Sequence, residues 1–128
     1  MRLYLDTSAF LKLLVEEPES TALVSQLRGG LSGQHMSSIL LETEARRAAH
    51  RMDLPQADVT TALSGVNLVD APRSLFAEAG LLAGSTLRTL DALHLATALR
   101  HSADVIISYD HHLLGAATSH GLPTASPA

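Results

Sequence analysis

Residues 104–110 read Asp104-Val105-Ile106-Ile107-Ser108-Tyr109-Asp110, with three consecutive β-branched residues followed by an acidic one. The apolar run predicts a short buried strand over 104–108. Asp110 follows at the expected start of a helix that runs to about Ala117. The same order occurs at the N-terminus, where the strand-like residues 2–5 precede Asp6 and a second expected helix. Strands that end in acidic residues and lead into helices indicate an α/β fold.

The rest of the chain follows the pattern of these two segments, because short apolar runs alternate with helical patterns throughout. Strands are expected at 2–5, 34–37, 66–69, 104–108 and 121–124, and helices at 7–15, 20–28, 38–52, 55–63, 72–82, 89–100 and 110–117. Thr89 is expected to cap the helix that it begins. Strands separated by helices favour right-handed βαβ units, and therefore a parallel sheet of about five short strands. We expect one domain over residues 1–125 and a frayed tail over 126–128.

The composition excludes several classes of protein. The chain has no cysteine, which rules out disulfides, thiolate zinc sites and cysteine nucleophiles. No apolar run reaches the roughly 18 residues of a membrane span, and Asp6 interrupts the N-terminus before a signal sequence could form. These features favour a cytoplasmic location. The net charge of −4 gives no general support for nucleic-acid binding.

Four acidic residues stand out because each lies where a strand ends or a helix begins: Asp6, Glu44, Asp91 and Asp110. Taken alone, Asp6 and Asp110 are typical helix caps, and Asp91 suits the first turn of its helix. Parallel strands, however, gather their carboxyl ends at one edge of the sheet, where open α/β folds bind ligands. Carboxylates that meet there need a cation, and a site built from oxygen ligands suits Mg²⁺ or Mn²⁺.

Two glutamates on the helix expected at 38–52 compete for the place in this site. Glu42 lies four residues before Arg46, a spacing typical of a surface ion pair. Glu44 has apolar residues three and four positions before it and four positions after it, so it should point at least partly inward. Residues i and i+2 cannot share a helix face. We therefore expect Glu44 in the site and Glu42 in solvent.

These motifs together resemble the PIN-domain family, specifically the VapC-type toxin ribonucleases of type II toxin–antitoxin systems. The resemblance covers essentially the whole chain, in the family's order and spacing. It rests on Leu5-Asp6-Thr7-Ser8, Ser37-Ser38 with Glu44-Ala45-Arg46-Arg47, Leu90-Asp91-Ala92-Leu93-His94-Leu95-Ala96, and Ser108-Tyr109-Asp110.

The resemblance implies an α/β/α sandwich and an Mg²⁺- or Mn²⁺-dependent endoribonuclease that uses a metal-activated water. It implies that Asp6 and Asp91 are the main metal ligands, and that Glu44 and Asp110 act mostly through metal-bound waters. Such toxins usually form homodimers, and sometimes larger assemblies with a cognate VapB-type antitoxin whose C-terminal segment occupies the toxin's groove. The RNA target and the cleavage site are not visible in the sequence.

Several neighbouring residues are expected to play supporting or purely structural parts. Thr7, Ser8 and Ser108 are candidate hydroxyl donors that fix the carboxylate rotamers. His94 is expected to be a packed helix histidine, and His111 and His112 to be solvated. Arg46, Arg47 and Arg51 form the best candidate patch for contact with RNA or antitoxin, against the alternative of an ordinary solvated face.

Other functions fit the sequence less well. A phospho-accepting receiver domain needs a lysine at the end of a late strand, but the single lysine is Lys12 in the first expected helix. A haloacid-dehalogenase phosphatase needs an Asp-x-Asp pair, where this chain has Asp6-Thr7-Ser8. A non-catalytic PIN scaffold is the remaining alternative, and the presence of all four acids counts against it.

Overall fold

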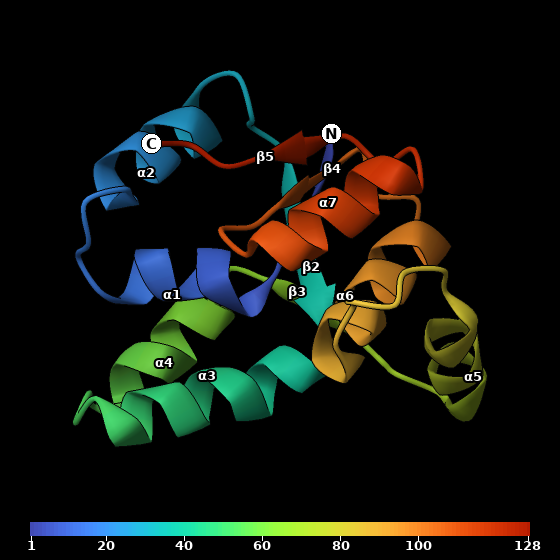
Figure 1. Ribbon diagram of the computed structural model, residues 1–128. Coiled ribbons are helices and arrows are strands. Elements are labelled where there is room, and N and C mark those ends of the chain that lie inside the picture. Colours follow the sequence, from blue (N-terminus) through green and yellow to red (C-terminus); the bar gives the residue numbers. More distant parts are fainter.

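A computed structural model describes all 128 residues as one parallel five-stranded sheet surrounded by helices (Figure 1). The strands are β1 (Arg2–Leu5), β2 (Gln34–Ser38), β3 (Asn67–Val69), β4 (Val105–Ile107) and β5 (Thr124–Ala125). The helices are α1 (Thr7–Leu14), α2 (Ser20–Arg28), α3 (Leu40–Arg51), α4 (Gln56–Leu63), α5 (Arg73–Leu81), α6 (Thr89–Arg100) and α7 (His111–Ser119). The α/β class and the parallel five-stranded sheet predicted from the sequence are confirmed.

The order of the strands fixes where a ligand can bind. Across the sheet the order is β3-β2-β1-β4-β5, and every pair is parallel. The chain therefore builds outward from β1 through β2 to β3, and then returns to the other side of β1 with β4 and β5. Open α/β sheets bind ligands at the carboxyl ends of strands where the order reverses in this way. Here that point lies between β1 and β4, which end at Leu5 and Ile107.

Alternating side chains of the strands bury both faces of the sheet. Tyr4 and Ile106 pack on the face covered by α6 and α7, in a cluster with residues of both helices. Leu3, Leu5 and Ile107 pack on the opposite face against α1 and α2. Figure 1 shows these helix pairs on the two sides of the sheet, with α3 and α4 packed together below α1. The period-2 alternation of short apolar strands is thus what creates the three layers.

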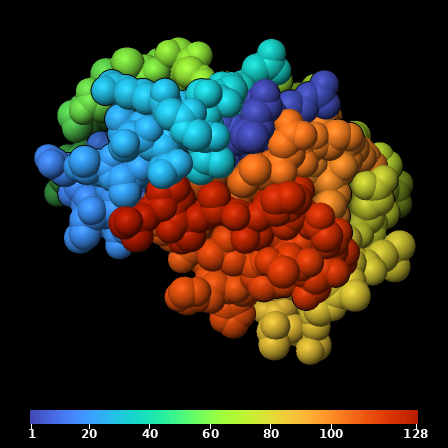
Figure 2. All heavy atoms as spheres, turned by 90° about the horizontal axis from the view of Figure 1, so that it is seen from above, coloured from blue at the N-terminus to red at the C-terminus, as the bar shows by residue number.

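The C-terminal segment differs from the sequence prediction. The expected strand at 121–124 forms instead as β5 at Thr124–Ala125. Leu122 is buried in the core, and Pro123 has no N–H with which to enter the ladder. The tail that was expected to fray is hydrogen-bonded to the domain: the Pro127 carbonyl accepts a hydrogen bond of 2.7 Å from the Tyr109 hydroxyl. Figure 2 shows this red segment lying against the light-blue residues of α2.

Two other local features were not as expected or not foreseen. Arg88, rather than Thr89, is the N-cap of α6, and no side chain caps this helix. Gly33 lies so close to the chain's start that an added Cβ would come within 2.1 Å of the Met1 carbonyl oxygen. That carbonyl also accepts a hydrogen bond from the Gln34 N–H at 2.8 Å, so any side chain at 33 would disturb the start of β2.

No helix in the structure combines the length and apolar character required to cross a lipid bilayer.

Candidate active site

Asp6 follows β1 directly and is the most buried of the four acids, with 4% of its surface exposed. One carboxylate oxygen, Oδ1, caps α1 by accepting the Ala9 N–H at 2.9 Å. Ser8 donates to Oδ1 at 2.7 Å, and Ser108 donates to the other oxygen, Oδ2, at 2.7 Å. Burial raises the pKa of Asp6, while the bonds from Ser108, Ala9 and Ser8 oppose that rise. No lysine or arginine pairs with this carboxylate, so it is a buried acid held by neutral donors alone.

Asp91 and Asp110 are joined by one arginine at the start of α6. Arg88 Nε donates to Asp91 Oδ2 at 3.1 Å, and its terminal amino group forms a short ion pair with Asp110 Oδ2. The hydrogen bond to Asp91, followed by the charges of both acids, raises the pKa of Arg88. Asp110 also caps α7, as predicted, through the N–H groups of His112 and Leu113. Arg88 therefore links the first turns of two helices that are separated in the sequence.

Glu44 points into the protein as expected and meets His94. Its Oε1 lies 2.8 Å from His94 Nε2, and 20% of its side chain is exposed. The other ring nitrogen, Nδ1, lies 2.6 Å from the Tyr4 hydroxyl. His94 is buried, as predicted for a packed helix histidine, but the contact with Glu44 was not foreseen. Because Tyr4 is two residues before Asp6 and His94 three after Asp91, this contact ties Glu44 to the other acidic segments.

Glu42 behaves as the sequence indicated. It forms an i,i+4 ion pair with Arg46 on the outer side of α3. Arg46 also donates to Gln56 and Thr60 on α4, at 3.2 Å and 3.1 Å. The candidate basic patch is thus divided: Arg46 is engaged within the fold, whereas Arg47 and Arg51 are exposed and form no ion pair.

The candidate hydroxyl residues do not all reach a carboxylate. Ser8 and Ser108 do, and both contact Asp6. Ser108 Oγ also accepts the Asp110 N–H at 3.0 Å, which connects the ends of β1 and β4. Thr7 lies beside His94 instead, with its hydroxyl 3.4 Å from Nε2. His111 and His112 are exposed, as expected.

The four acids therefore lie at one edge of the sheet in two linked groups. Asp6, Asp110 and Asp91 are connected through Ser108 and Arg88, and Glu44 is connected through His94 to the strand before Asp6. In this arrangement no three acidic or histidine side chains are close enough to share one ion. The donor set is nevertheless all hard oxygen, and Asp6 is a buried carboxylate without a cation, so the residues fit a divalent metal chemically. Arg88 occupies one oxygen of Asp91 and one of Asp110, so an ion at these carboxylates would compete with it.

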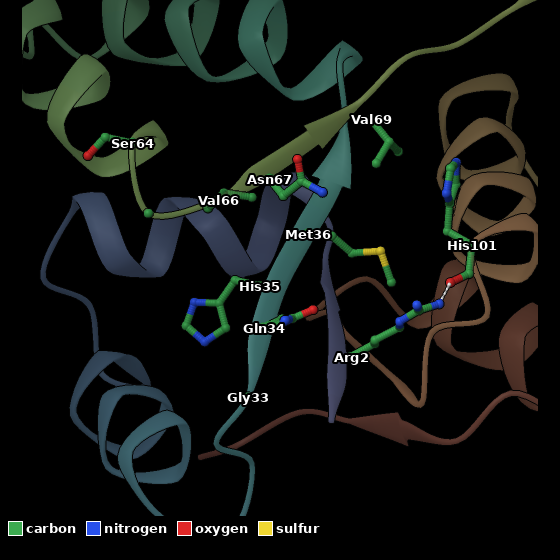
Figure 3. A pocket seen from close by; sticks show the side chains of 11 residues that line it. Arg2, Gly33, Gln34, His35, Met36, Ser64, Val66, Asn67, Val69 and His101 are labelled. Carbon is green, nitrogen blue, oxygen red and sulfur yellow. Dashed lines mark hydrogen bonds between the residues drawn. The ribbon is translucent and has the colours of Figure 1, made fainter.

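A large hollow lies at the opposite edge of the sheet. It has a volume of about 830 Å³ and is lined by the starts of β1, β2 and β3. Figure 3 shows Arg2, Gln34, His35 and Asn67 around it, with Arg2 donating to the His101 carbonyl at 3.0 Å. None of its lining residues is acidic. The hollow therefore supplies no carboxylate ligand for a cation, and the acids at the carboxyl edge remain the candidate site.

A parallel sheet with this strand order and a linked set of acids at its carboxyl edge defines the class of protein. The family model of the PIN domain matches residues 3–118, and the chain belongs to this family. Among curated proteins it is similar to Ribonuclease VapC46 of Mycobacterium tuberculosis H37Rv, at 37% identity over 128 residues, covering 98% of this chain and 97% of the relative. It is also 34% identical over 131 residues to Ribonuclease VapC47 of Mycobacterium tuberculosis CDC 1551, covering 98% and 96%. These matches place it among the VapC-type members of the family.

Solved structures support the same fold. Mycobacterium tuberculosis VapC20, described as a toxin that cleaves the sarcin–ricin loop, aligns with a TM-score of 0.76 at 16% identity, over 98% of this chain and 99% of that one. VapBC2 of Rickettsia felis, solved with a DNA fragment from its promoter, aligns with a TM-score of 0.74 at 13% identity, over the full length of both chains. At such identities the likeness establishes the fold alone.

Arg88 and the link between Tyr4 and His94 were not identified from the sequence as part of the site. Arg88 has a local signal, since it lies three residues before Asp91, a spacing at which side chains on a helix meet. Its second contact, with Asp110, has no local signal because 22 residues separate the two. The link between Tyr4 and His94 spans 90 residues and could not have been read from either segment.

Proposed function

We propose that this protein is the toxin of a VapBC-type toxin–antitoxin pair and acts as a metal-dependent endoribonuclease that hydrolyses RNA phosphodiester bonds. The observation that carries the proposal is that hydrogen bonds through Ser108 and Arg88 connect Asp6, Asp110 and Asp91 at the carboxyl edge of the sheet, where the strand order reverses. Glu44 is connected to the strand before Asp6 through His94 and Tyr4. The full-length similarity to proteins named as VapC ribonucleases supports it.

In the proposed mechanism Asp6 and Asp91 would hold Mg²⁺ or Mn²⁺. When bound, the ion would lower the pKa of a water and neutralise charge that develops on the phosphate. Ser8 and Ser108 keep the Asp6 carboxylate in one rotamer by their hydrogen bonds. Glu44 and Asp110 would accept hydrogen bonds from water at the site, and Glu44 would orient the water that attacks phosphorus. No covalent protein intermediate is required.

The proposal extends to partners. The RNA substrate and a cognate VapB-type antitoxin would both approach the carboxyl edge, and the protein would work in the cytoplasm as a homodimer or within a larger toxin–antitoxin assembly. The exposed Arg47 and Arg51 are the candidates for contact with the RNA backbone or the antitoxin. Arg46 is less available, because it is hydrogen-bonded to Gln56 and Thr60 on α4. Light scattering of the purified protein, alone and with the antitoxin, measures the assembly directly.

The test is cleavage of RNA by the purified protein. Total RNA is incubated with Mg²⁺, with Mn²⁺ or with EDTA, and the new ends are sequenced. We expect defined cuts that EDTA and Asp91→Asn abolish, and that Glu42→Gln, a matched control on the outer face of α3, leaves unchanged. Cuts that persist in EDTA would refute the metal requirement. Metal-independent RNA binding without cleavage would instead favour the non-catalytic scaffold.

A further inference from the structure

A buried chain of hydrogen bonds leads from the backbone of β2 to the carboxylate of Glu44. The Ser38 N–H donates to the Tyr4 hydroxyl at 3.1 Å. That hydroxyl lies 2.6 Å from His94 Nδ1, and His94 Nε2 lies 2.8 Å from Glu44 Oε1. Tyr4 is fully buried and His94 is 3% exposed, with their rings in an edge contact at 73° and 5.7 Å between centroids.

The chemistry of these groups fixes the direction of the chain. The Tyr4 hydroxyl accepts the Ser38 N–H and has a single proton of its own to donate. The acceptor within hydrogen-bond distance is His94 Nδ1, at 2.6 Å. The nearby hydroxyls of Ser37 and Thr97 donate to backbone carbonyls. When Nδ1 accepts the hydrogen bond from Tyr4, the ring N–H that faces Glu44 is on Nε2, with the Thr7 hydroxyl more distant at 3.4 Å.

This direction matters for Glu44, because a glutamate has three rotatable side-chain bonds and the Glu44 side chain is partly exposed. One carboxylate oxygen, Oε1, is held by His94, while Oε2 receives no hydrogen bond from the protein. The held oxygen fixes the plane of the carboxylate, and the other oxygen is available to accept a water. The chain also crosses β1, α3 and α6, the elements that carry or adjoin Asp6, Glu44 and Asp91.

We propose that Tyr4 and His94 are positioning residues that orient the Glu44 carboxylate by donating toward it from a fixed Nε2–H tautomer. The inference rests on the proposed function in that Glu44 works on the attacking water. Neither Tyr4 nor His94 touches RNA or metal in this scheme. Their effect on cleavage passes through Glu44, so it should change the rate of the chemical step and leave RNA affinity alone.

The first test reads the tautomer without any activity measurement. Long-range ¹H–¹⁵N NMR of histidine-labelled protein at pH 8 separates the two neutral tautomers, and the signal lost in His94→Gln assigns His94 among the seven histidines. We expect Nε2–H in the parent, a mixture of tautomers in Tyr4→Phe, and no change in Tyr109→Phe. Tyr109 is a matched control because its hydroxyl bonds the Pro127 carbonyl and has no link to Glu44. An Nδ1–H tautomer in the parent would overturn the inference whether or not the protein cleaves RNA.

The second test separates positioning from general destabilisation. Single-turnover cleavage of a fluorescent RNA with Mn²⁺ gives the rate, and anisotropy in EDTA gives the RNA Kd. Loss of one buried hydrogen bond corresponds to about a tenfold effect, so Tyr4→Phe and His94→Leu should slow cleavage roughly tenfold at unchanged Kd. His94→Gln keeps an N–H donor near the Nε2 position and should recover most of the rate.

The outcomes distinguish the two proposals. If the parent is active and both Tyr4→Phe and His94→Leu cleave RNA at the parent's rate, the positioning role is refuted while the proposed nuclease function stands. A parent that cleaves no RNA would refute the proposed function, while the tautomer measurement would still decide the direction of the chain. Should Tyr4→Phe fold poorly because the Ser38 N–H loses its acceptor, the contrast between His94→Gln and His94→Leu decides the role.

Discussion

Replacing the Asp6 carboxylate by an amide should stabilise the metal-free protein while abolishing cleavage. Asp6 is 4% exposed and has no cationic partner, so its charge is costly to bury. The Asp6→Asn substitution is not expected to disturb the local structure: an amide oxygen can cap α1 through the Ala9 N–H, and asparagine is as good an N-cap as aspartate. Ser8 can still donate to that amide oxygen, and the Ser108 hydroxyl can rotate to accept from the new amide nitrogen.

The expected magnitude follows from typical gains when a strained functional residue is replaced. We expect Asp6→Asn to raise the free energy of unfolding by about 1 kcal/mol in EDTA at pH 8. For a domain of this size that corresponds to a Tm higher by about 4 °C. Asp58→Asn, at an exposed position in the first turn of α4, is the matched control and should shift the Tm far less.

The pH dependence gives this prediction its sign. Burial raises the pKa of Asp6 above its ordinary value of 3.8, so in the pH range between these two values the folded protein binds more protons than the unfolded chain. Stability therefore falls as pH rises through that range. The advantage of Asp6→Asn should be small at pH 3.8 and below, grow as pH rises, and level off above the folded-state pKa of Asp6.

Calorimetry of both proteins across pH, with EDTA and then with Mn²⁺, is the assay. Mn²⁺ at a hundred times its Kd should stabilise the parent by about 2.7 kcal/mol and stabilise Asp6→Asn much less. Two results would contradict this prediction. An Asp6→Asn protein less stable than the parent in EDTA at pH 8 would mean that the buried charge is favourable. Equal stabilisation of both proteins by Mn²⁺ would remove Asp6 from the ligands.

Three further outcomes follow from the same structure. Arg88→Gln should bind Mn²⁺ about threefold to tenfold more tightly in calorimetric titration, because the guanidinium no longer competes for the two carboxylates that it bridges; an unchanged Kd would contradict this. Glu44→Gln should slow RNA cleavage by at least about tenfold whereas Glu42→Gln should leave the rate within about twofold, and the reverse order would overturn the choice of helix face. Gly33→Ala should lower the free energy of unfolding by about 2 kcal/mol in urea titrations, since its Cβ would meet the Met1 carbonyl, and a neutral effect would show that the N-terminus yields.

Most of the secondary structure could be predicted because it depends on local pattern. The strand at 2–5 and the helix at 89–100 were predicted at their observed bounds, and the caps formed by Asp6 and Asp110 also agree. The misplaced last strand shows the limit of this approach. Residues 121–124 have no periodicity long enough to set a register, and pairing with β4 places the strand at Thr124–Ala125.

The same limit applies to the candidate site: local features could be predicted and long-range contacts could not. Local sequence pattern was enough to single out Asp6, Asp91 and Asp110, which occupy strand ends and first helical turns, and to show which glutamate of α3 faces inward. It could not show what holds those acids: Arg88 between Asp91 and Asp110, and a tyrosine–histidine pair behind Glu44. Helix and strand periodicity act over a few residues, whereas the contacts from Arg88 to Asp110 and from Tyr4 to His94 join side chains 22 and 90 positions apart, which meet once the sheet has assembled.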